Sequence, residues 1–240
     1  MTSTSLELSR AWPARPRWAS LRALFRPAAP EGSRRLLNVA VAALGLVAAA
    51  PLMLLIAALV KVTSRGPVFY TQTRVGLDRR SPGRPDQNWR RVADAGGRPF
   101  TIYKFRTMRP NGHPGAEVWA RPGDPRVTAL GRVLRQFRLD ELPQLVNVLR
   151  GDMNVVGPRP EQPVIFADLR RCIAEYQRRQ RVRPGITGWA QIHQRYDRSI
   201  DDVRRKVTFD LEYVARQSAT LDFKIMLRTV PVMLLRRGAC

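Results

Sequence analysis

An uncharged apolar run at residues 36–60 constrains the fold of this chain more than any other feature. Its 25 residues include one strongly polar side chain, Asn38. Because about 20 apolar residues in a helix suffice to cross a bilayer, the run by itself favours a straight signal anchor. A cleaved signal peptide fits poorly, since the run and the basic region before it are both too long. A wholly buried core helix is the third interpretation.

Pro51 lies inside this run and should kink a helix there, because proline removes a backbone donor and clashes with the preceding turn. Both flanks are basic, with Arg34 and Arg35 before the run and Lys61 and Arg65 after it. Positive charge favours the cytoplasmic side of a membrane. A helix that bends at Pro51, entering and leaving on the cytoplasmic face, would satisfy both flanks.

The apolar run divides the chain into a basic tail (1–33), a membrane helix (34–62) and a domain (63–240). Lys+Arg 42 against Asp+Glu 19 gives a net charge of +23, which indicates anionic partners such as nucleic acid, anionic lipids or phosphorylated substrates. A membrane-anchored nucleic-acid-binding protein is one alternative. However, no standard nucleic-acid motif or stacking platform is present. Two cysteines and two histidines give neither a disulfide framework nor a metal-ligand spacing, which favours a reducing, cytoplasmic setting.

The residue pattern predicts an α+β fold that is mainly helical, with a small β-hairpin or sheet. Alternation and β-forming residues predict strands at 68–75 and 100–107, and residues 153–156 should be extended. The last helix is apolar and basic, which suits a membrane interface, although a core helix with a basic exposed face fits equally well. Loops are expected at 78–98 and 183–192, a short helix near 116–120, and further helices at 128–137, 140–149, 163–181, 200–216 and 221–237.

Two adjacent carboxylates, Asp140 and Glu141, stand among arginines just before an apolar helical stretch. Neighbouring side chains in a helix point about 100° apart, so these two cannot form a symmetric pair around one bond. They could perform two different tasks at one phosphate, such as attack and metal ligation. Aspartate is also a favoured N-cap, and the local sequence alone favours that interpretation for Asp140.

Five cations are candidates to bind phosphate oxygens. Each of them alone fits a solvated surface charge in so basic a chain. Taken with the two carboxylates and the apolar run, they predict an enzyme that handles a phosphorylated substrate at a membrane surface. The five are Lys104, Arg106, Arg135, Arg138 and Arg159.

Four motifs resemble the bacterial sugar transferases, the monotopic polyprenyl-phosphate phosphoglycosyl transferases. They occur in order: Lys-Phe-Arg-Thr-Met at 104–108, Leu-Asp-Glu-Leu-Pro-Gln-Leu at 139–145, Gly-Asp-Met followed by Val-Gly-Pro-Arg-Pro within 151–160, and Arg-Pro-Gly-Ile-Thr-Gly-Trp-Ala-Gln-Ile at 183–192. The resemblance covers about residues 33 to 235. It implies the short, minimal form of the family, which lacks the four extra transmembrane helices and further domain of larger members.

The resemblance implies a re-entrant helix bent at Pro51 and amphipathic interfacial helices around a catalytic domain. Ala50 stands where members often have serine, so no hydroxyl is available there to bond the bent backbone. The domain would lie on the cytoplasmic face of the bacterial cytoplasmic membrane, in contact with anionic lipids. There it would transfer a sugar-1-phosphate from a UDP-sugar to undecaprenyl phosphate, beginning exopolysaccharide, O-antigen or glycoprotein glycan assembly.

The resemblance also assigns roles to the candidate residues. Asp140 would attack the β-phosphate of the UDP-sugar and release UMP, leaving a phosphosugar on the aspartate. Mg²⁺ would be the cofactor, with Asp140 and Glu141 as ligands, and Glu141 could instead assist the acceptor. Lys104, Arg106, Arg135 and Arg159 would bind phosphate or nucleotide. A non-catalytic membrane scaffold is a further alternative. Nucleic acid is not an implied partner. The sugar, the pathway and the oligomeric state stay open, and a homodimer is possible.

Overall fold

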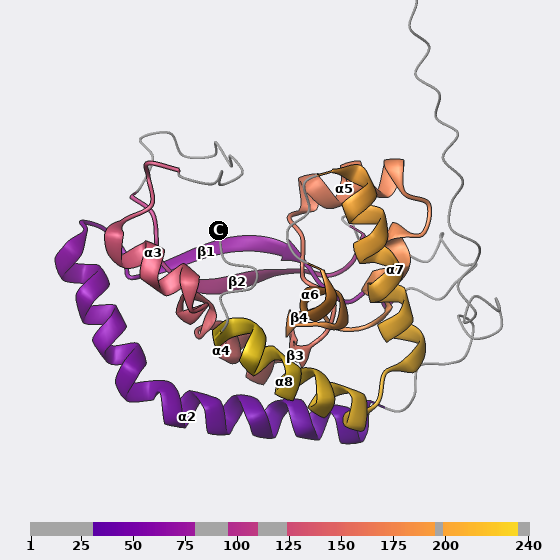
Figure 1. The fold of residues 1–240 in the computed structure, drawn as a ribbon, viewed down its shortest axis with the longest axis horizontal. Coiled ribbons are helices and arrows are strands. Elements are labelled where there is room, and N and C mark those ends of the chain that lie inside the picture. Colours follow the sequence, from indigo (N-terminus) through magenta and orange to yellow (C-terminus); the bar gives the residue numbers. More distant parts are fainter. Residues whose placement is uncertain (1–30, 80–95, 110–123, 195–198, 235–240) are drawn as a thin grey trace, which may run out of the picture.

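The computed structural model describes residues 31–79, 96–109, 124–194 and 199–234. The basic tail, most of the loop at 78–98 and the short helix near 116–120 lie outside these residues. Helices outweigh strands in the described part, as the sequence predicted (Figure 1). Its elements are α2 (Gly32–Thr63), β1 (Phe69–Val75), β2 (Pro99–Phe105), α3 (Ala129–Gln136), the 3₁₀ turn η2 (Leu139–Glu141), α4 (Gln144–Arg150), β3 (Asn154–Val156), α5 (Pro163–Cys172), the 3₁₀ helix η3 (Tyr176–Arg181), β4 (Gly185–Thr187), α6 (Trp189–His193), α7 (Ile200–Arg216) and α8 (Ala219–Leu234).

Two small sheets carry the strands. β1 and β2 pair antiparallel, with Phe69 opposite Phe105, which confirms the predicted hairpin or sheet. β3 and β4 pair in parallel, so the prediction of a loop throughout 183–192 was wrong. A Cβ on Gly185 would lie 2.1 Å from the backbone nitrogen of Gly157. The glycines at this point therefore allow two chain segments to approach closely, rather than making a loose loop.

The apolar run forms α2, which stays helical through Pro51 and changes direction along its length (Figure 1). It is the one helix in the described ranges that is long and apolar enough to cross a membrane. Only 11% of its most apolar window is buried, so the interpretation as a buried core helix was wrong. Leu44, Val47 and Leu54 are each more than 70% exposed. A large exposed apolar surface of this kind marks a membrane or protein contact.

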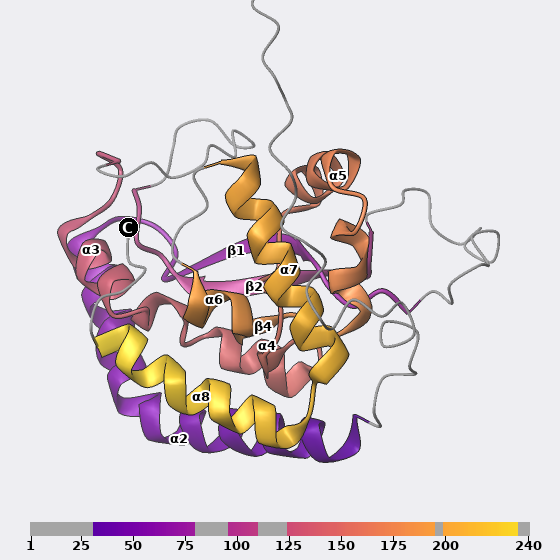
Figure 2. The same ribbon diagram turned by 45° about the vertical axis from the view of Figure 1, so that its right-hand side comes forward.

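Helix α8 lies beside α2 (Figures 1 and 2). One side of it packs into the core, where Ile225 is fully buried against Val156 and Tyr213. Phe223, Leu227 and Val230 on the same helix are exposed. Two neighbouring helices thus both present uncovered apolar side chains, and the placement of α8 at a membrane interface stays a prediction.

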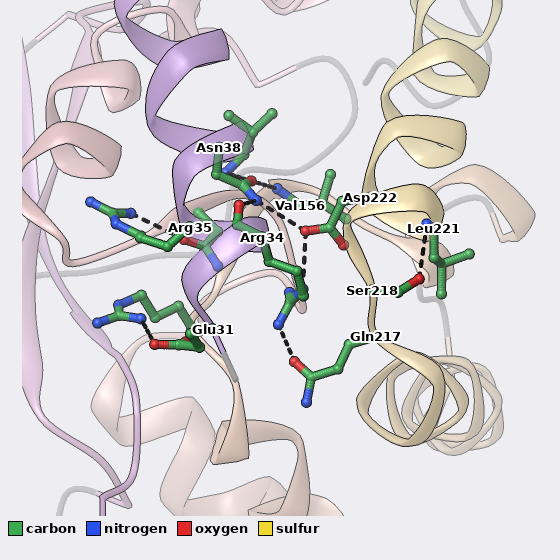
Figure 3. A network of polar contacts seen from close by, with 12 residues as sticks. Glu31, Arg34, Arg35, Asn38, Val156, Gln217, Ser218, Leu221 and Asp222 are labelled. Carbon is green, nitrogen blue, oxygen red and sulfur yellow. Dashed lines mark hydrogen bonds and ion pairs between the residues drawn. The ribbon is translucent and has the colours of Figure 1, made fainter. Parts of the chain in front are cut away.

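A buried polar network fixes the start of α2 to the rest of the fold (Figure 3). Arg34 donates to Asp222 at 3.3 Å and also binds Gln217. Asn38 donates to the same carboxylate at 3.0 Å, and its carbonyl oxygen accepts from the backbone nitrogens of Val155 and Val156. β3 and α8 therefore satisfy the hydrogen bonds of the one strongly polar side chain in the apolar run. Without these partners, burying its amide would be costly.

Helix caps explain why two predicted helices match the structure closely. The Thr128 hydroxyl accepts from the backbone nitrogen of Gly131 at the start of α3, and Ser199 forms a capping box with Asp202 at the start of α7. The predicted helix 163–181 was wrong beyond Cys172, because Ile173 is extended and buries its side chain. The chain then forms η3, whose period of three places Tyr176 and Arg179 on one buried face.

Candidate active site

The two carboxylates lie in the 3₁₀ turn η2, between α3 and α4. Arg138 precedes it with φ 53, the one left-handed non-glycine residue in the described part of the chain. Such a conformation costs on the order of 1 kcal/mol and is typical of functional sites. The prediction of one helix from Asp140 was wrong, as was the N-cap interpretation, because Pro143 stands before α4 and separates it from η2. Asp140 and Glu141 are only 7% and 5% exposed.

Glu141 is held by cations from three parts of the fold. Its Oε1 lies 2.7 Å from Nζ of Lys104 on β2 and 2.6 Å from Nη2 of Arg159, which follows β3. Arg138 Nη1 lies 3.9 Å from Oε2. Burial alone would raise the pKa of Glu141, but Arg159 and Lys104 outweigh it and hold that pKa well below its ordinary value. Glu141 is therefore a fixed anion.

Asp140 differs from its neighbour. Its side chain makes no hydrogen bond or ion pair within the residues that the structure describes. Burial, followed by the negative charge of Glu141, raises its pKa, while Lys104, Arg159 and Arg135 oppose that rise. Burial likewise lowers the pKa of Lys104, despite the opposing effect of Glu141. The site therefore combines an unengaged, desolvated carboxylate with a second carboxylate that organises cations around it.

The other predicted arginines separate into two groups. Arg135 on α3 is close enough for its charge to lower the pKa of Asp140, against the rise caused by burial. Its Nε donates to the Thr107 hydroxyl at 2.9 Å. Arg106 instead donates to the backbone oxygens of Arg65 and Ser64, at 2.7 and 2.8 Å. In the described part of the chain it contacts neither carboxylate. The structure thus brings Lys104, Arg135 and Arg159 to the site and places Arg106 at the end of α2.

A second set of residues, which the sequence analysis did not identify, fixes the loop that carries Arg159. Arg179 is completely buried, and its Nη2 donates to the backbone oxygen of Arg159 at 3.0 Å. The same guanidinium pairs with Asp210 at 2.7 Å, and its Nη1 donates to the Tyr176 hydroxyl at 2.8 Å. Burial raises the pKa of Tyr176 to about 12. Only its spacing of three from Tyr176 could have distinguished Arg179 from the other arginines.

Glu161 secures the other end of this loop. Its carboxylate binds Lys206 at 3.0 Å and lies 3.7 Å from Arg179. Its backbone oxygen accepts from the nitrogen of Val75 at 2.9 Å. Although burial would raise its pKa, Lys206 and Arg179 lower it to about 2. The loop that carries Arg159 is thus fixed by the ion pairs of Glu161 and Arg179.

The two carboxylates are the candidate ligands for Mg²⁺ at this site. The described ranges contain no group of three or more His, Cys, Asp or Glu side chains that could hold a metal ion by themselves. Mg²⁺ is commonly bound by one or two carboxylates together with the phosphates of a substrate. The free carboxylate of Asp140, with Glu141 next to it, fits that mode of binding.

The fold thus combines one long, largely exposed apolar helix with a buried cluster of two carboxylates and several cations. Residues 30–236 match the family model described as bacterial sugar transferase, and the chain belongs to that family. Its membership confirms the resemblance carried by the four sequence motifs.

Several curated relatives are similar over most of this chain. A UDP-N-acetylgalactosamine-undecaprenyl-phosphate N-acetylgalactosaminephosphotransferase of Aeromonas hydrophila is 40% identical over 206 residues, covering 86% of this chain and 44% of its own length. A UDP-glucose:undecaprenyl-phosphate glucose-1-phosphate transferase of Caulobacter vibrioides is 42% identical over 84% of this chain and 69% of its own. The exopolysaccharide production protein ExoY of Sinorhizobium fredii is 37% identical over 86% and 88%. The chain thus spans less than half of the Aeromonas relative.

Proposed function

We propose that this protein transfers a sugar-1-phosphate from a UDP-sugar to undecaprenyl phosphate. One observation carries the proposal: a buried, unengaged Asp140 stands beside a Glu141 that gathers Lys104, Arg138 and Arg159. The names of the relatives support the substrates, because they combine UDP-sugars with undecaprenyl phosphate. The reaction would begin exopolysaccharide, O-antigen or glycan assembly.

In the first step, an Asp140 oxygen attacks the β-phosphorus of the UDP-sugar. The bond from that phosphorus to the bridging oxygen breaks, UMP leaves with the electron pair, and the sugar-1-phosphate remains joined to the aspartate as an acyl phosphate. A desolvated carboxylate without hydrogen-bond partners is a stronger nucleophile than a solvated one. Arg159, Lys104 and Arg135 are placed to bind the phosphate oxygens as charge develops on them.

In the second step, a phosphate oxygen of undecaprenyl phosphate attacks the phosphorus held on Asp140. The bond between that phosphorus and the aspartate oxygen breaks, which frees Asp140 and gives the polyprenyl-diphosphate sugar. Glu141 keeps Lys104 and Arg159 in place throughout both steps. Mg²⁺, bound by the carboxylates and the substrate phosphates, would neutralise phosphate charge and favour the departure of UMP.

We propose a monotopic placement on the cytoplasmic face of the bacterial inner membrane. The exposed apolar side chains of α2 and the basic residues at both of its ends support this placement. A long polyprenyl tail cannot leave the bilayer cheaply, so the site must lie near the head groups. Single cysteines at Gly32 and Ser64, in a chain with both native cysteines replaced by serine, would test the topology. Labelling of both from the cytoplasmic side supports a re-entrant helix, and labelling from opposite sides supports a spanning anchor.

The function is tested by measuring UMP release from a panel of UDP-sugars, with undecaprenyl phosphate and Mg²⁺ present. Release with at least one sugar, absent in Asp140→Asn, would support the reaction and identify the donor. Folded protein that releases no UMP with any donor would contradict it. Salt-sensitive binding to DNA without turnover would instead support the nucleic-acid alternative. A fully active Asp140→Asn protein would exclude the catalytic role of the aspartate.

A further inference from the structure

A recess of about 110 Å³ opens beside the carboxylate site and is not used by the steps above. Arg138 and Glu141 are the charged residues of its lining. Leu142, Leu145, Ile192 and Val232 provide apolar walls from the η2–α4 segment, α6 and α8. A charged end and apolar walls suit a ligand with an anionic head and a hydrocarbon body.

Two of the polar groups on the walls are already satisfied within the protein. The Thr187 and Thr229 hydroxyls, which also line the recess, lie 2.8 Å from each other. The Thr229 hydroxyl also donates to the backbone oxygen of Ile225 at 2.8 Å. These two hydroxyls are therefore poor partners for the many hydroxyls of a sugar ring. The side-chain oxygen of Gln191, which also lines the recess, is buried without a partner in the described part of the chain and can accept one hydrogen bond. Because most of the remaining lining is apolar, the recess favours an apolar occupant with few polar groups.

The recess is lined in part by α8, a helix that also carries exposed apolar side chains. Val232 lines it from α8, whose side chains Leu227 and Val230 are exposed to the surroundings. The volume of the recess is similar to that of apolar cavities that bind small hydrocarbons; one of about 150 Å³ binds benzene.

We infer that this recess binds the first isoprene units of the lipid acceptor, next to its phosphate. The inference rests on the proposed function and assigns to the acceptor a subsite separate from that of the donor. The phosphate of the acceptor would lie at the end near Arg138, within reach of the phosphorus carried by Asp140. The rest of the polyprenyl chain would continue towards the membrane.

The experiment compares Val232→Trp, which fills the recess, with Val230→Trp on the exposed part of the same helix. Apparent KM values are measured for undecaprenyl phosphate and for the UDP-sugar that the wild type uses, each with the other substrate saturating. Val232→Trp should raise the KM for undecaprenyl phosphate roughly tenfold or more, because each buried methylene contributes to binding. The KM for the UDP-sugar should stay unchanged, and Val230→Trp should resemble the wild type in both. Thermal melting checks that both variants are folded. If Val232→Trp does not fold, Ile192→Phe is a second variant that fills the recess.

The outcomes separate this inference from the function beneath it. Unchanged KM values for undecaprenyl phosphate in the folded, filled variants would overturn the inference and leave the proposed function intact. A rise in the KM for the UDP-sugar alone would assign the recess to the donor and overturn it as well. Wild-type protein without turnover of any UDP-sugar would overturn the proposed function and this inference together.

Discussion

Nη2 of Arg159 lies 2.6 Å from Oε1 of Glu141, and this contact joins the loop after β3 to the turn that carries Asp140. The pair organises the site from two segments that are 18 residues apart in the chain. Because Glu141 takes up the cations, Asp140 stays unengaged. Because Asp140 is the proposed nucleophile and Glu141 holds the cations, substitutions of the two residues should have different effects.

Asp140→Asn should abolish turnover while leaving the protein at least as stable as the wild type. Burial raises the pKa of Asp140, so its ionised form lowers the stability of the folded state as pH rises through that pKa. Removing the charge relieves this cost at neutral pH, as is common for active-site residues. Turnover should fall by at least about 10³-fold. A melting temperature well below that of the wild type would contradict the prediction.

Glu141→Gln should behave in the opposite way. It leaves Lys104 and Arg159 facing each other without the carboxylate between them, at a site that is largely buried. We expect a loss of about 1–3 kcal/mol in unfolding free energy, as well as slower turnover. Thermal melting in detergent, with Asp140→Asn as the matched control, measures the difference. Equal stability of the two variants would show that Glu141 does not organise the cations.

Arg179 should act as a positioning residue for Arg159. Arg179→Met removes the hydrogen bond to the Arg159 backbone and leaves Asp210 buried without its partner, at a cost of about 3–5 kcal/mol. The double variant Arg179→Met with Asp210→Asn should recover part of this stability, because no charge is then stranded. It should still show a raised KM for the UDP-sugar, since Arg159 is no longer fixed. Recovery of the wild-type KM in the double variant would limit Arg179 to a structural role.

Protonation of Glu161 in acid should lower the free energy of unfolding. Its pKa is lowered to about 2 from an ordinary value of 4.5, so its contribution is present above pH 4.5 and is lost as pH falls towards 2. The shift corresponds to at most about 3 kcal/mol. Unfolding free energies measured between pH 2 and 6 should fall more steeply for the wild type than for Glu161→Gln. Parallel curves for the two proteins would contradict the prediction.

The exposed face of α2 predicts how the protein partitions onto membranes. Leu54→Glu places a charge on that face, which costs roughly 2–3 kcal/mol in an apolar bilayer, whereas Val164→Glu alters an exposed side chain on α5. The fraction of protein that sediments with membranes after a high-salt wash should fall for Leu54→Glu alone. A similar fall in both variants would argue against α2 as the specific membrane contact.

Local sequence signals predicted the elements whose ends are set by local chemistry. Thr128 and Ser199 cap their helices with their own hydroxyls, so α3 and α7 begin where the sequence indicated. The site was harder to foresee, because tertiary contacts decide it. Asp140 lies in a 3₁₀ turn rather than at a helix cap, and only the folded chain shows that Arg179 holds Arg159 while Arg106 binds the end of α2. In so basic a chain, one arginine cannot be distinguished from another by sequence alone.

The central claim is that Asp140 carries the phosphosugar during the reaction, and the mass of the protein tests it most directly. The wild type is incubated with its UDP-sugar and Mg²⁺ in the absence of undecaprenyl phosphate, quenched rapidly and examined by intact mass and peptide mapping. We predict an added sugar-1-phosphate on the peptide that contains Asp140, which disappears when undecaprenyl phosphate is supplied and never forms in Asp140→Asn. Protein that completes turnover without ever acquiring this mass, or that acquires it at another residue, would contradict the claim.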